Sequence, residues 1–285
     1  MLSTLEIQRP RRLAVLGVGL LGASVLRAAQ ACLPDTKLSA WSRSSSSRHA
    51  VADIADTFDT PADAVRDADC IILAAPVDAL ASLLESINPA LSVDAWVTDV
   101  GSTKRGVHAA ASQLLTKPER FIGSHPMAGS EKGGAAQGHA KLFVGRPCII
   151  TTLSKTDLAL VKSATALWTA LGANVTQMTP EAHDDAVAAI SHLPHATACA
   201  LAHLLSKKQA RLDLAAGGLR DTTRVAAGDP SLWVPILLES ADHLIPLLKE
   251  LEQSSAELRN LLAKKDADGV RAYLDGARAF RRRLD

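Results

Sequence analysis

Residues 13–24 of the 285-residue chain read LAVLGVGLLGAS and decide its fold. The apolar run Leu13–Leu16 predicts a buried strand, and Gly17, Gly19 and Gly22 follow in G-x-G-x-x-G spacing at the start of a predicted helix. The first glycine permits a tight turn, the second lets the backbone approach a pyrophosphate, and the third lets the helix pack on the strand. Helix N-termini attract phosphate, so the pattern predicts a dinucleotide site. The residues expected to contact the phosphates are Gly17, Gly19, Leu20, Leu21 and Gly22.

Strand and helix patterns then alternate along the chain up to Met178, which is typical of a parallel-type sheet with helices on its faces. Beyond Thr179-Pro180-Glu181, which resembles a helix N-terminus, the chain reads as helical only. We therefore predict an α/β protein with a doubly wound Rossmann-type domain (residues 1–178) followed by an all-α substrate and dimerisation domain (residues 179–285). The predicted later strands are 37–41, 70–75, 95–100, 121–125, 147–152 and 174–178, and a helix is expected over 155–171.

The end of the second predicted strand bears on which dinucleotide is bound. An acidic residue usually holds the adenosine ribose there, but this chain has Ser42, Arg43 and Ser44 in a serine-rich segment that ends with Arg48. The guanidinium of Arg43, assisted by that of Arg48, suits a ribose 2′-phosphate, so we expect NADP to be preferred, with NAD possible. The alternative is a solvated serine-rich loop. Where the next strand ends, Ala75 and Pro76 are expected to face the same cofactor.

A histidine stands at the end of the next apolar run, in the stretch FIGSHPMAGSEKGG at residues 121–134. Ligands in open α/β sheets bind beyond the carboxyl ends of the strands, so His125 is expected to face a cleft. The alternative is that His125 only caps its strand. Loops at that edge commonly carry function, which favours the first interpretation.

The first helix of the second domain carries a polar stripe on an Ala/Leu background. Asp184, Ser191 and His195 are spaced to share one face, and such a stripe is costly to bury without partners or a ligand. His183, His192 and His195 invite a metal interpretation. No cysteine or compact carboxylate set completes such a site, so no metal is expected.

Two arginines follow one turn apart, at Arg220 and Arg224. Paired guanidinium groups suit capture of carboxylates, although a surface salt bridge with Asp221 would explain the same pattern. Trp233 begins the next predicted helix, and the apolar helices beyond it indicate a dimer interface.

Composition excludes several classes of protein. Lys and Arg (31) nearly balance Asp and Glu (30), and aromatic residues are scarce, which argues against a nucleic-acid partner. Cys32, Cys70, Cys148 and Cys199 lie far apart in apolar surroundings, and buried free thiols in a reducing cytoplasm are expected. The run after Arg9-Pro10-Arg11-Arg12 resembles a twin-arginine or secretory signal. It is too short to span a membrane and carries the glycine pattern, so a cytoplasmic protein without a membrane partner is predicted.

Five motifs together resemble the prephenate/arogenate dehydrogenase family. They are GVGLLGAS, TDVGSTK, GSHPMAGSE, ISHLPH and DTTRVA, in this order within residues 12–250. The resemblance implies oxidative decarboxylation of a cyclohexadiene with a ring hydroxyl and a ring carboxylate. It assigns the catalytic base to His125 and the orientation of the hydroxyl to Ser102. It implies a substrate site made of Ser130, Glu131, Ser191, His195, Arg220, Arg224 and Trp233, with Asp184 completing or gating it at a dimer interface.

The resemblance leaves the side chain of the substrate open. Prephenate carries a ketone where arogenate carries an amine, and an acidic residue such as Glu131 or Asp184 near that group would favour arogenate. Glu239-Ser240 replaces the usual asparagine, with no consequence that the sequence reveals. A β-hydroxyacid dehydrogenase or imine reductase is a remote alternative, disfavoured because Lys207 lacks a glycine-rich context. A dinucleotide-sensing protein would not need His125.

Overall fold

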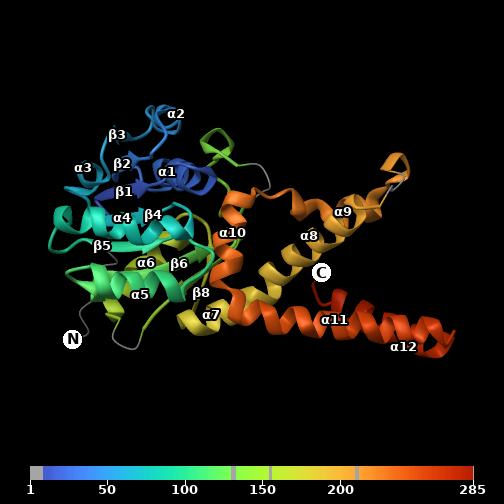
Figure 1. The fold of residues 1–285 in the computed structure, drawn as a ribbon. Coiled ribbons are helices and arrows are strands. Elements are labelled where there is room, and N and C mark those ends of the chain that lie inside the picture. The colour runs from blue at the N-terminus through green and yellow to red at the C-terminus, as the bar shows by residue number, and fades with distance from the viewer. Residues whose placement is uncertain (1–8, 130–132, 154–155, 209–211, 285) are drawn as a thin grey trace. The chain divides into compact units, whose positions relative to one another are not determined.

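The computed structural model describes residues 9–129, 133–153, 156–208 and 212–284 (Figure 1). The chain forms two compact units, one ending at Ser240 and the other beginning at Ala241. The first unit contains the whole sheet and the helices up to α10. The domain boundary expected after residue 178 stays a prediction.

The eight-stranded sheet has the order β3-β2-β1-β4-β5-β6-β7-β8. Chain order reverses between β1 and β4, which makes that point the switch crevice of a doubly wound sheet. The predicted strands are all present, whereas the short, largely exposed β3 lacks the apolar run that would have revealed it. The strands are β1 (Arg12–Leu16), β2 (Lys37–Trp41), β3 (Asp56–Phe58), β4 (Cys70–Leu73), β5 (Trp96–Asp99), β6 (Phe121–Pro126), β7 (Pro147–Thr151) and β8 (Asn174–Met178).

The sheet is of the expected parallel type except at one pairing, where β7 runs antiparallel to β6. A parallel pair needs a crossover to the opposite end of the sheet. In the described part of the segment joining β6 to β7, only turns and the short 3₁₀ helix η4 (Ala135–Gln137) occur. The polypeptide therefore runs back beside β6 in the opposite direction, as β7. Strand β8 is again parallel to β7, after the crossover helix α6 (Leu158–Ala170).

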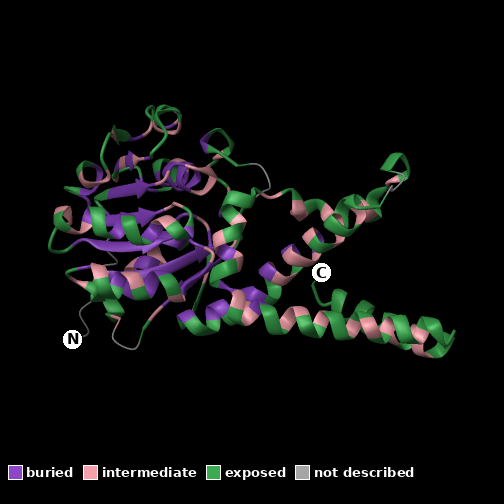
Figure 2. Cartoon of the chain, viewed as in Figure 1, coloured by how far each residue is buried: buried purple, intermediate pink, exposed green. Residues whose placement is uncertain are grey.

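Both faces of the sheet are covered, so its central strands are apolar throughout. Leu13 and Val15 pack in a core with α1 (Leu20–Cys32) and α6, whereas Ala14 and Leu16 pack in a second core on the other face. Figure 2 shows burial concentrated on these strands. The second core contains residues of α3 (Pro61–Val65), α4 (Leu80–Ile87) and α5 (Arg105–Leu114), while α2 (Ser45–His49) is a short helix after β2.

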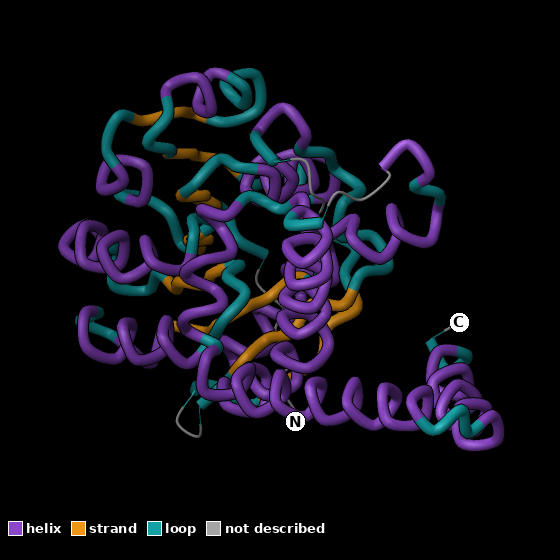
Figure 3. The backbone as a smooth tube through the Cα atoms, turned by 45° about the vertical axis from the view of Figure 1, so that its right-hand side comes forward, coloured by secondary structure: helices purple, strands orange, loops and turns teal. Residues whose placement is uncertain are grey.

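The described residues after Met178 form helices and no strand, as predicted (Figure 3). Thr179 caps the first of these helices by accepting from the Ala182 amide, and Pro180 is its first residue. The first unit holds α7 (Pro180–Val187), the π-helical turn η5 (Ala188–His192), α8 (Leu193–Ser206), η6 (Leu212–Leu214), α9 (Gly217–Thr223), η7 (Arg224–Ala227) and α10 (Pro230–Glu239). The second unit consists of α11 (Ala241–Ala263) and α12 (Ala267–Arg281), joined by a hydrogen bond of 2.7 Å between the Ser254 and Tyr273 hydroxyls. Among the described residues, no single helix has both the length and the apolar composition to cross a membrane.

The four cysteines are free thiols, but only two are buried as expected. Cys70 and Cys148 lie inside β4 and β7, whereas Cys32 is exposed at the end of α1 and Cys199 is half-buried in α8. The last residue of an amphipathic helix lies outside the core even when its neighbours are apolar.

Candidate active site

The turns after four parallel strands meet at one edge of the sheet. Leu16 is level with Trp41 on one side and with Leu73 on the other, and Leu73 is level with Asp99. Thr98 pairs with Ile122, so His125 extends to the level of the loop after β5. This carboxyl edge therefore places the glycine turn, the end of β2, the loop after β5 and His125 next to one another.

The glycine turn has the geometry that a pyrophosphate requires. Gly17 has φ +104°, and a Cβ on it would lie 2.4 Å from the Ala74 carbonyl oxygen. A Cβ on Gly22 would lie 1.9 Å from the Gly17 oxygen, so the first and third glycines are needed for packing. A Cβ on Gly19 would meet nothing within 4 Å. The open approach to Gly19, at the N-terminus of α1 where no side chain caps the helix, fits a dinucleotide phosphate.

The end of β2 presents one unpaired cation. Arg43 is exposed and forms no hydrogen bond or ion pair with another described residue, and Ser44 caps α2. Arg48 is committed elsewhere, since its guanidinium donates to the Ser42 carbonyl (2.6 Å) and pairs with Asp59 (2.9 Å). The sequence hypothesis that Arg48 assists a 2′-phosphate is therefore not supported. Asp59, which follows β3, is the carboxylate that the structure brings to this end of the sheet.

A pocket of about 440 Å³ opens beside His125 at this edge. It brings together Ser102, His125, Ser191, Arg224 and Trp233 from five separate segments, all predicted from the sequence. A larger hollow of about 540 Å³ lies at the amino ends of β1, β2 and β5, away from the edge where α/β sheets bind ligands. We define the strand wall of the pocket as Ser102, His125, Pro126, Met127, Ala128, Gly129 and Gly133, and the helix wall as Ser191, Arg224, Val225, Gly228, Asp229, Leu232 and Trp233.

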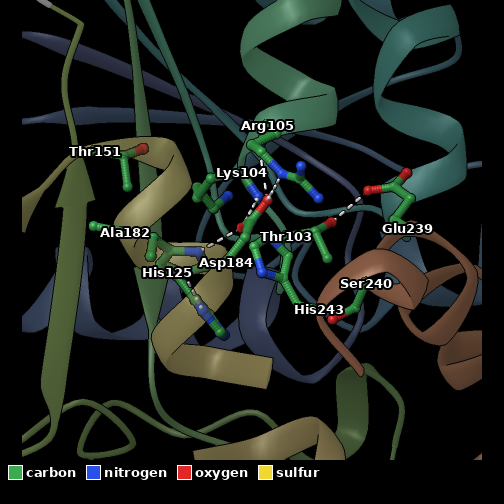
Figure 4. A network of polar contacts seen from close by, with 12 residues as sticks. Thr103, Lys104, Arg105, His125, Thr151, Ala182, Asp184, Glu239, Ser240 and His243 are labelled. Carbon is green, nitrogen blue, oxygen red and sulfur yellow. Dashed lines mark hydrogen bonds and ion pairs between the residues drawn. The ribbon is translucent and has the colours of Figure 1, made fainter. Parts of the chain in front are cut away.

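The His125 imidazole ends a buried chain of hydrogen bonds (Figure 4). Its Nδ1 lies 2.9 Å from Nε2 of His183 in α7, and Nδ1 of His183 lies 2.7 Å from Oδ1 of Asp184. Asp184 also accepts the backbone N–H groups of Lys104 (2.8 Å) and Arg105 (3.0 Å), and the Arg105 guanidinium pairs with it. These bonds tie α7 to the loop after β5 and leave Nε2 of His125 for the pocket.

Asp184 is therefore not a pocket residue. The sequence hypothesis placed it beside the substrate or at a gate, on the face of Ser191. It is instead buried, and its carboxylate is used by backbone amides and by His183. Helical spacing alone could not reveal this, because the π-helical turn η5 shifts the angular register between Asp184 and Ser191.

A second buried carboxylate shapes the loop that carries Ser102. Asp99 accepts the backbone N–H groups of Gly101 (2.8 Å) and Ser124 (3.2 Å) and pairs with the fully buried Lys104 ammonium. A buried pair of opposite charges whose carboxylate also accepts backbone hydrogen bonds holds a specific geometry. Asp99 thus holds the loop after β5 against β6, one residue before His125.

Burial sets the ionisation of this cluster. Desolvation, with added repulsion from His183 and Lys104, holds the pKa of His125 well below its usual value, and desolvation also lowers the pKa of His183. Burial alone would raise the pKa of Asp184, but hydrogen bonds from His183, Arg105 and Lys104 lower it to about 2. At neutral pH, both imidazoles are neutral and Asp184 is a carboxylate.

The helix wall is built from short, irregular elements. Ser191 lies in the π-helical turn η5, and Arg224 begins the 3₁₀ turn η7. The Trp233 ring stacks on His195 with centroids 3.4 Å apart, so His195 is buried behind the tryptophan rather than lining the pocket. Arg220 is exposed, and its Nε donates to the Ala215 carbonyl. Ser130 and Glu131 lie outside the described residues.

The end of α10 is joined to the rest of the site by two side chains. The Ser240 hydroxyl lies 2.9 Å from Nδ1 of His192, and Thr103 donates to Glu239 at 2.5 Å. Ser240 therefore completes a buried contact with η5. Glu239 connects the helix that carries Trp233 to the loop that carries Ser102.

Three of the histidines between α7 and α8, namely His183, His192 and His195, have separate partners. His183 bonds His125 and Asp184, His192 bonds Ser240, and His195 stacks on Trp233. Among the described residues, no three His, Cys, Asp or Glu side chains converge as metal ligands.

Sequence reasoning missed His183, Asp99 and Asp229. His183 and Asp184 are adjacent at the start of a predicted helix, and only their partners in β6 and the loop after β5 give them a role. Asp229 forms part of the helix wall and caps α10 through its bond to the Ser231 amide (2.9 Å). Asp99 is a carboxylate at a strand end two residues before Gly101, which is the local signal that could have singled it out.

Two family models match nearly the whole chain. The models named "prephenate dehydrogenase, nucleotide-binding domain" and "prephenate dehydrogenase, dimerization domain" match residues 27–177 and 179–276. A cyclohexadienyl dehydrogenase of Zymomonas mobilis is 35% identical over 266 residues, which is 90% of each chain.

Two solved structures share the fold over nearly the whole chain. The prephenate dehydrogenase of Aquifex aeolicus, in complex with hydroxyphenyl propionate and NAD+, superposes with a TM-score of 0.90 at 29% identity, covering 96% of this chain and 98% of that one. The arogenate dehydrogenase of Synechocystis superposes with a TM-score of 0.81 at 28% identity, covering 96% and 100%.

Proposed function

Because the chain belongs to the prephenate dehydrogenase family and is therefore a nicotinamide-dependent oxidoreductase, we propose that it converts prephenate to 4-hydroxyphenylpyruvate, with His125 as the base. The observation that carries this proposal is the position of His125. Its ring lines the pocket beside Ser102, and among the described residues only Nδ1 of the ring is bonded to another side chain.

The base removes the proton of the substrate's ring hydroxyl as the carbinol carbon is oxidised. A neutral imidazole is required, and the lowered pKa of His125 keeps it neutral at physiological pH. The bound nicotinamide supplies the hydride acceptor. Nε2 of His125 takes the hydroxyl proton, and Ser102, which lines the same pocket, orients the hydroxyl toward it.

The helix wall recognises the anionic parts of the substrate. Arg224 supplies a guanidinium for a carboxylate, Ser191 adds a hydroxyl, and Trp233 covers the ring. His195 acts behind Trp233 by fixing the indole plane through stacking. The substrate proposal therefore rests on Arg224 and not on Arg220, which lies outside the described pocket lining.

The cofactor is NADP in preference to NAD. The glycine turn has room at Gly19 for the pyrophosphate, and Ala75 and Pro76 follow β4 at the same edge. Arg43 is the free cation at the end of β2, while Asp59 is neutralised by Arg48. A 2′-phosphate would pair with Arg43 and meet no unpaired carboxylate there.

Arogenate is the second candidate substrate, and Asp229 is the observation that favours it. Its carboxylate lines the helix wall, and hydrogen bonds from Ser231 keep its pKa lowered. An anion at this point attracts the side-chain amine of arogenate. The same carboxylate is used to cap α10, which is why prephenate is placed first.

The enzyme acts in the cytoplasm as a homodimer. Four free thiols suit a reducing compartment. The apolar side chains exposed on the helices after Leu193 suit burial against a second copy, and the matched dimerization model covers the same helices. These side chains include Leu204, Leu212, Leu214, Leu238, Leu262, Leu274 and Phe280.

A spectrophotometric assay that crosses prephenate and arogenate with NAD and NADP tests the proposal. The expected result is the highest kcat/KM for prephenate with NADP. A higher value for arogenate would transfer the function to the second candidate. Absence of turnover with either substrate, by folded protein that binds the cofactor, would contradict the proposed activity.

A further inference from the structure

The hydrogen bonds around His125 fix more than its position, because they determine which of its ring nitrogens carries the proton. Asp184 is ionised and accepts only, so the proton shared with His183 belongs to Nδ1 of His183. A neutral His183 then has a bare Nε2, which accepts from His125. Nδ1 of His125 must therefore be the N–H donor across the 2.9 Å contact.

We propose that His183 and Asp184 are positioning residues that hold His125 in the tautomer with its lone pair on Nε2, facing the pocket. This inference rests on the proposed function, since it gives the tautomer a purpose only if His125 is the base. It goes further by assigning a role to two buried residues that do not line the pocket.

The contacts of Asp184 explain why each hydrogen bond in the series from His125 through His183 to Asp184 keeps its donor and its acceptor. Its Oδ1 takes the Lys104 amide together with His183, and its Oδ2 takes the Arg105 amide and guanidinium. Every described partner of the Asp184 carboxylate donates a hydrogen bond to it. Whichever carboxylate oxygen faces His183, it can only accept from that imidazole. The buried Lys104 ammonium is paired with Asp99. The orientation of both imidazoles follows from one carboxylate.

The proton balance of the step is simple. The O–H bond of the substrate breaks as the N–H bond at Nε2 of His125 forms, and His125 becomes an imidazolium with both nitrogens protonated. Nδ1–H continues to donate to His183, and Asp184 remains a carboxylate that stabilises the positive charge through His183. No second proton moves along the chain.

The test replaces His183 with leucine, which keeps a similar volume but cannot accept a hydrogen bond. Nitrogen-15 NMR of histidine-labelled protein at neutral pH, with His125 assigned by its substitution, reads the tautomer directly. In the wild type, we expect His125 to be protonated at Nδ1. In His183→Leu, the Nε2–H form should appear, and kcat should fall by roughly 10- to 1,000-fold, with KM and cofactor affinity changed by less than about threefold.

Two further variants separate positioning from packing. His183→Gln offers an amide oxygen to the same N–H and should recover part of the lost kcat. His108→Leu makes the same substitution at a buried histidine that bonds Thr151 and takes no part in the hydrogen bonds between His125, His183 and Asp184. It should leave the His125 tautomer unchanged. Melting curves confirm that each variant is folded.

The outcomes distinguish this inference from the proposed function. A wild-type His125 protonated at Nε2, or a folded His183→Leu enzyme with unchanged kcat, would overturn the inference while leaving the base assignment intact. Equal losses in folded His183→Gln and His183→Leu would also count against it. If His125→Asn itself keeps full activity, the proposed function fails first.

Discussion

The strand wall and the helix wall of the pocket are built in different ways. His125 and Ser102 are held from behind by the buried carboxylates of Asp99 and Asp184 and by their partners, all within the first unit. Arg224 and Trp233 come instead from short helical segments interrupted by 3₁₀ and π turns, and Arg224 is exposed. The strand wall is supported by hydrogen bonds from buried residues behind it. The helix wall presents side chains from short helical segments.

The difference matches the two tasks of the site. Proton transfer needs a fixed distance and a fixed tautomer, which buried and satisfied polar networks supply. Recognition of a substrate side chain can be tuned by changing single residues on a helix. We therefore expect changes to the strand wall to reduce kcat and changes to the helix wall to raise KM.

The largest effect should come from removing the base. His125→Asn keeps a polar side chain of smaller size but lacks a nitrogen that accepts protons, so kcat should fall by roughly 10²–10⁴-fold. Cofactor affinity, measured by fluorescence titration, should be unchanged. A folded variant with wild-type kcat would remove His125 from catalysis.

Acid should destabilise the folded protein next. Burial lowers the pKa of His108 and of His192 to about 4, against 6.5 for an exposed histidine. The unfolded chain therefore binds protons between pH 6.5 and 4 while the folded chain does not, so stability is full above pH 6.5 and is lost as the pH falls. At pH 5, the loss is roughly 2 kcal/mol for each histidine.

Urea unfolding at pH 7.5 and pH 5 measures this loss. His108→Gln should shrink the wild-type difference between the two pH values by roughly 2 kcal/mol, whatever its absolute stability. An unchanged difference would mean that His108 is not held neutral in the folded protein.

The helix wall should respond through KM. Arg224→Ala removes a guanidinium from an exposed position, so we expect KM to rise by about 10- to 100-fold, with a smaller change in kcat. Arg220→Ala is the matched comparison one helical turn earlier, and it should raise KM by less than about threefold. Equal effects of the two substitutions would mean that both arginines hold the substrate.

The smallest effect concerns the cofactor, outside both walls. Arg43→Asp places a carboxylate where a 2′-phosphate would bind and should lower the preference for NADP over NAD by about tenfold. Arg48→Gln should change the preference less, because Arg48 is already paired with Asp59. If Arg43→Asp leaves the ratio of kcat/KM values unchanged, the end of β2 does not select the cofactor.

The sequence predicted most of the sheet because its signals are local. Leu13–Leu16 and the three glycines specify a strand, a turn and a helix without help from the rest of the chain. The direction of β7 could not be predicted in this way, because it depends on the end of the sheet to which the segment after β6 leads.

The sequence predicted those pocket residues whose chemistry is evident from their own motif. Ser102, His125, Ser191, Arg224 and Trp233 line it as the motifs indicated. Asp184 was misplaced because helical spacing assumes a regular helix, and η5 is a π turn. His195 was predicted as a contact, but only the fold shows that Trp233 stands in front of it.

The central claim is that a neutral His125 takes the substrate proton, and the pH profile of kcat tests it most directly. In the wild type, we expect kcat to be flat above about pH 6.5 and to fall at lower pH with a single-proton limb, displaced below the usual histidine range by burial. In His125→Asn, that limb should be absent and the residual rate low throughout. A folded His125→Asn enzyme that keeps the same acid limb and a near wild-type rate would contradict the account.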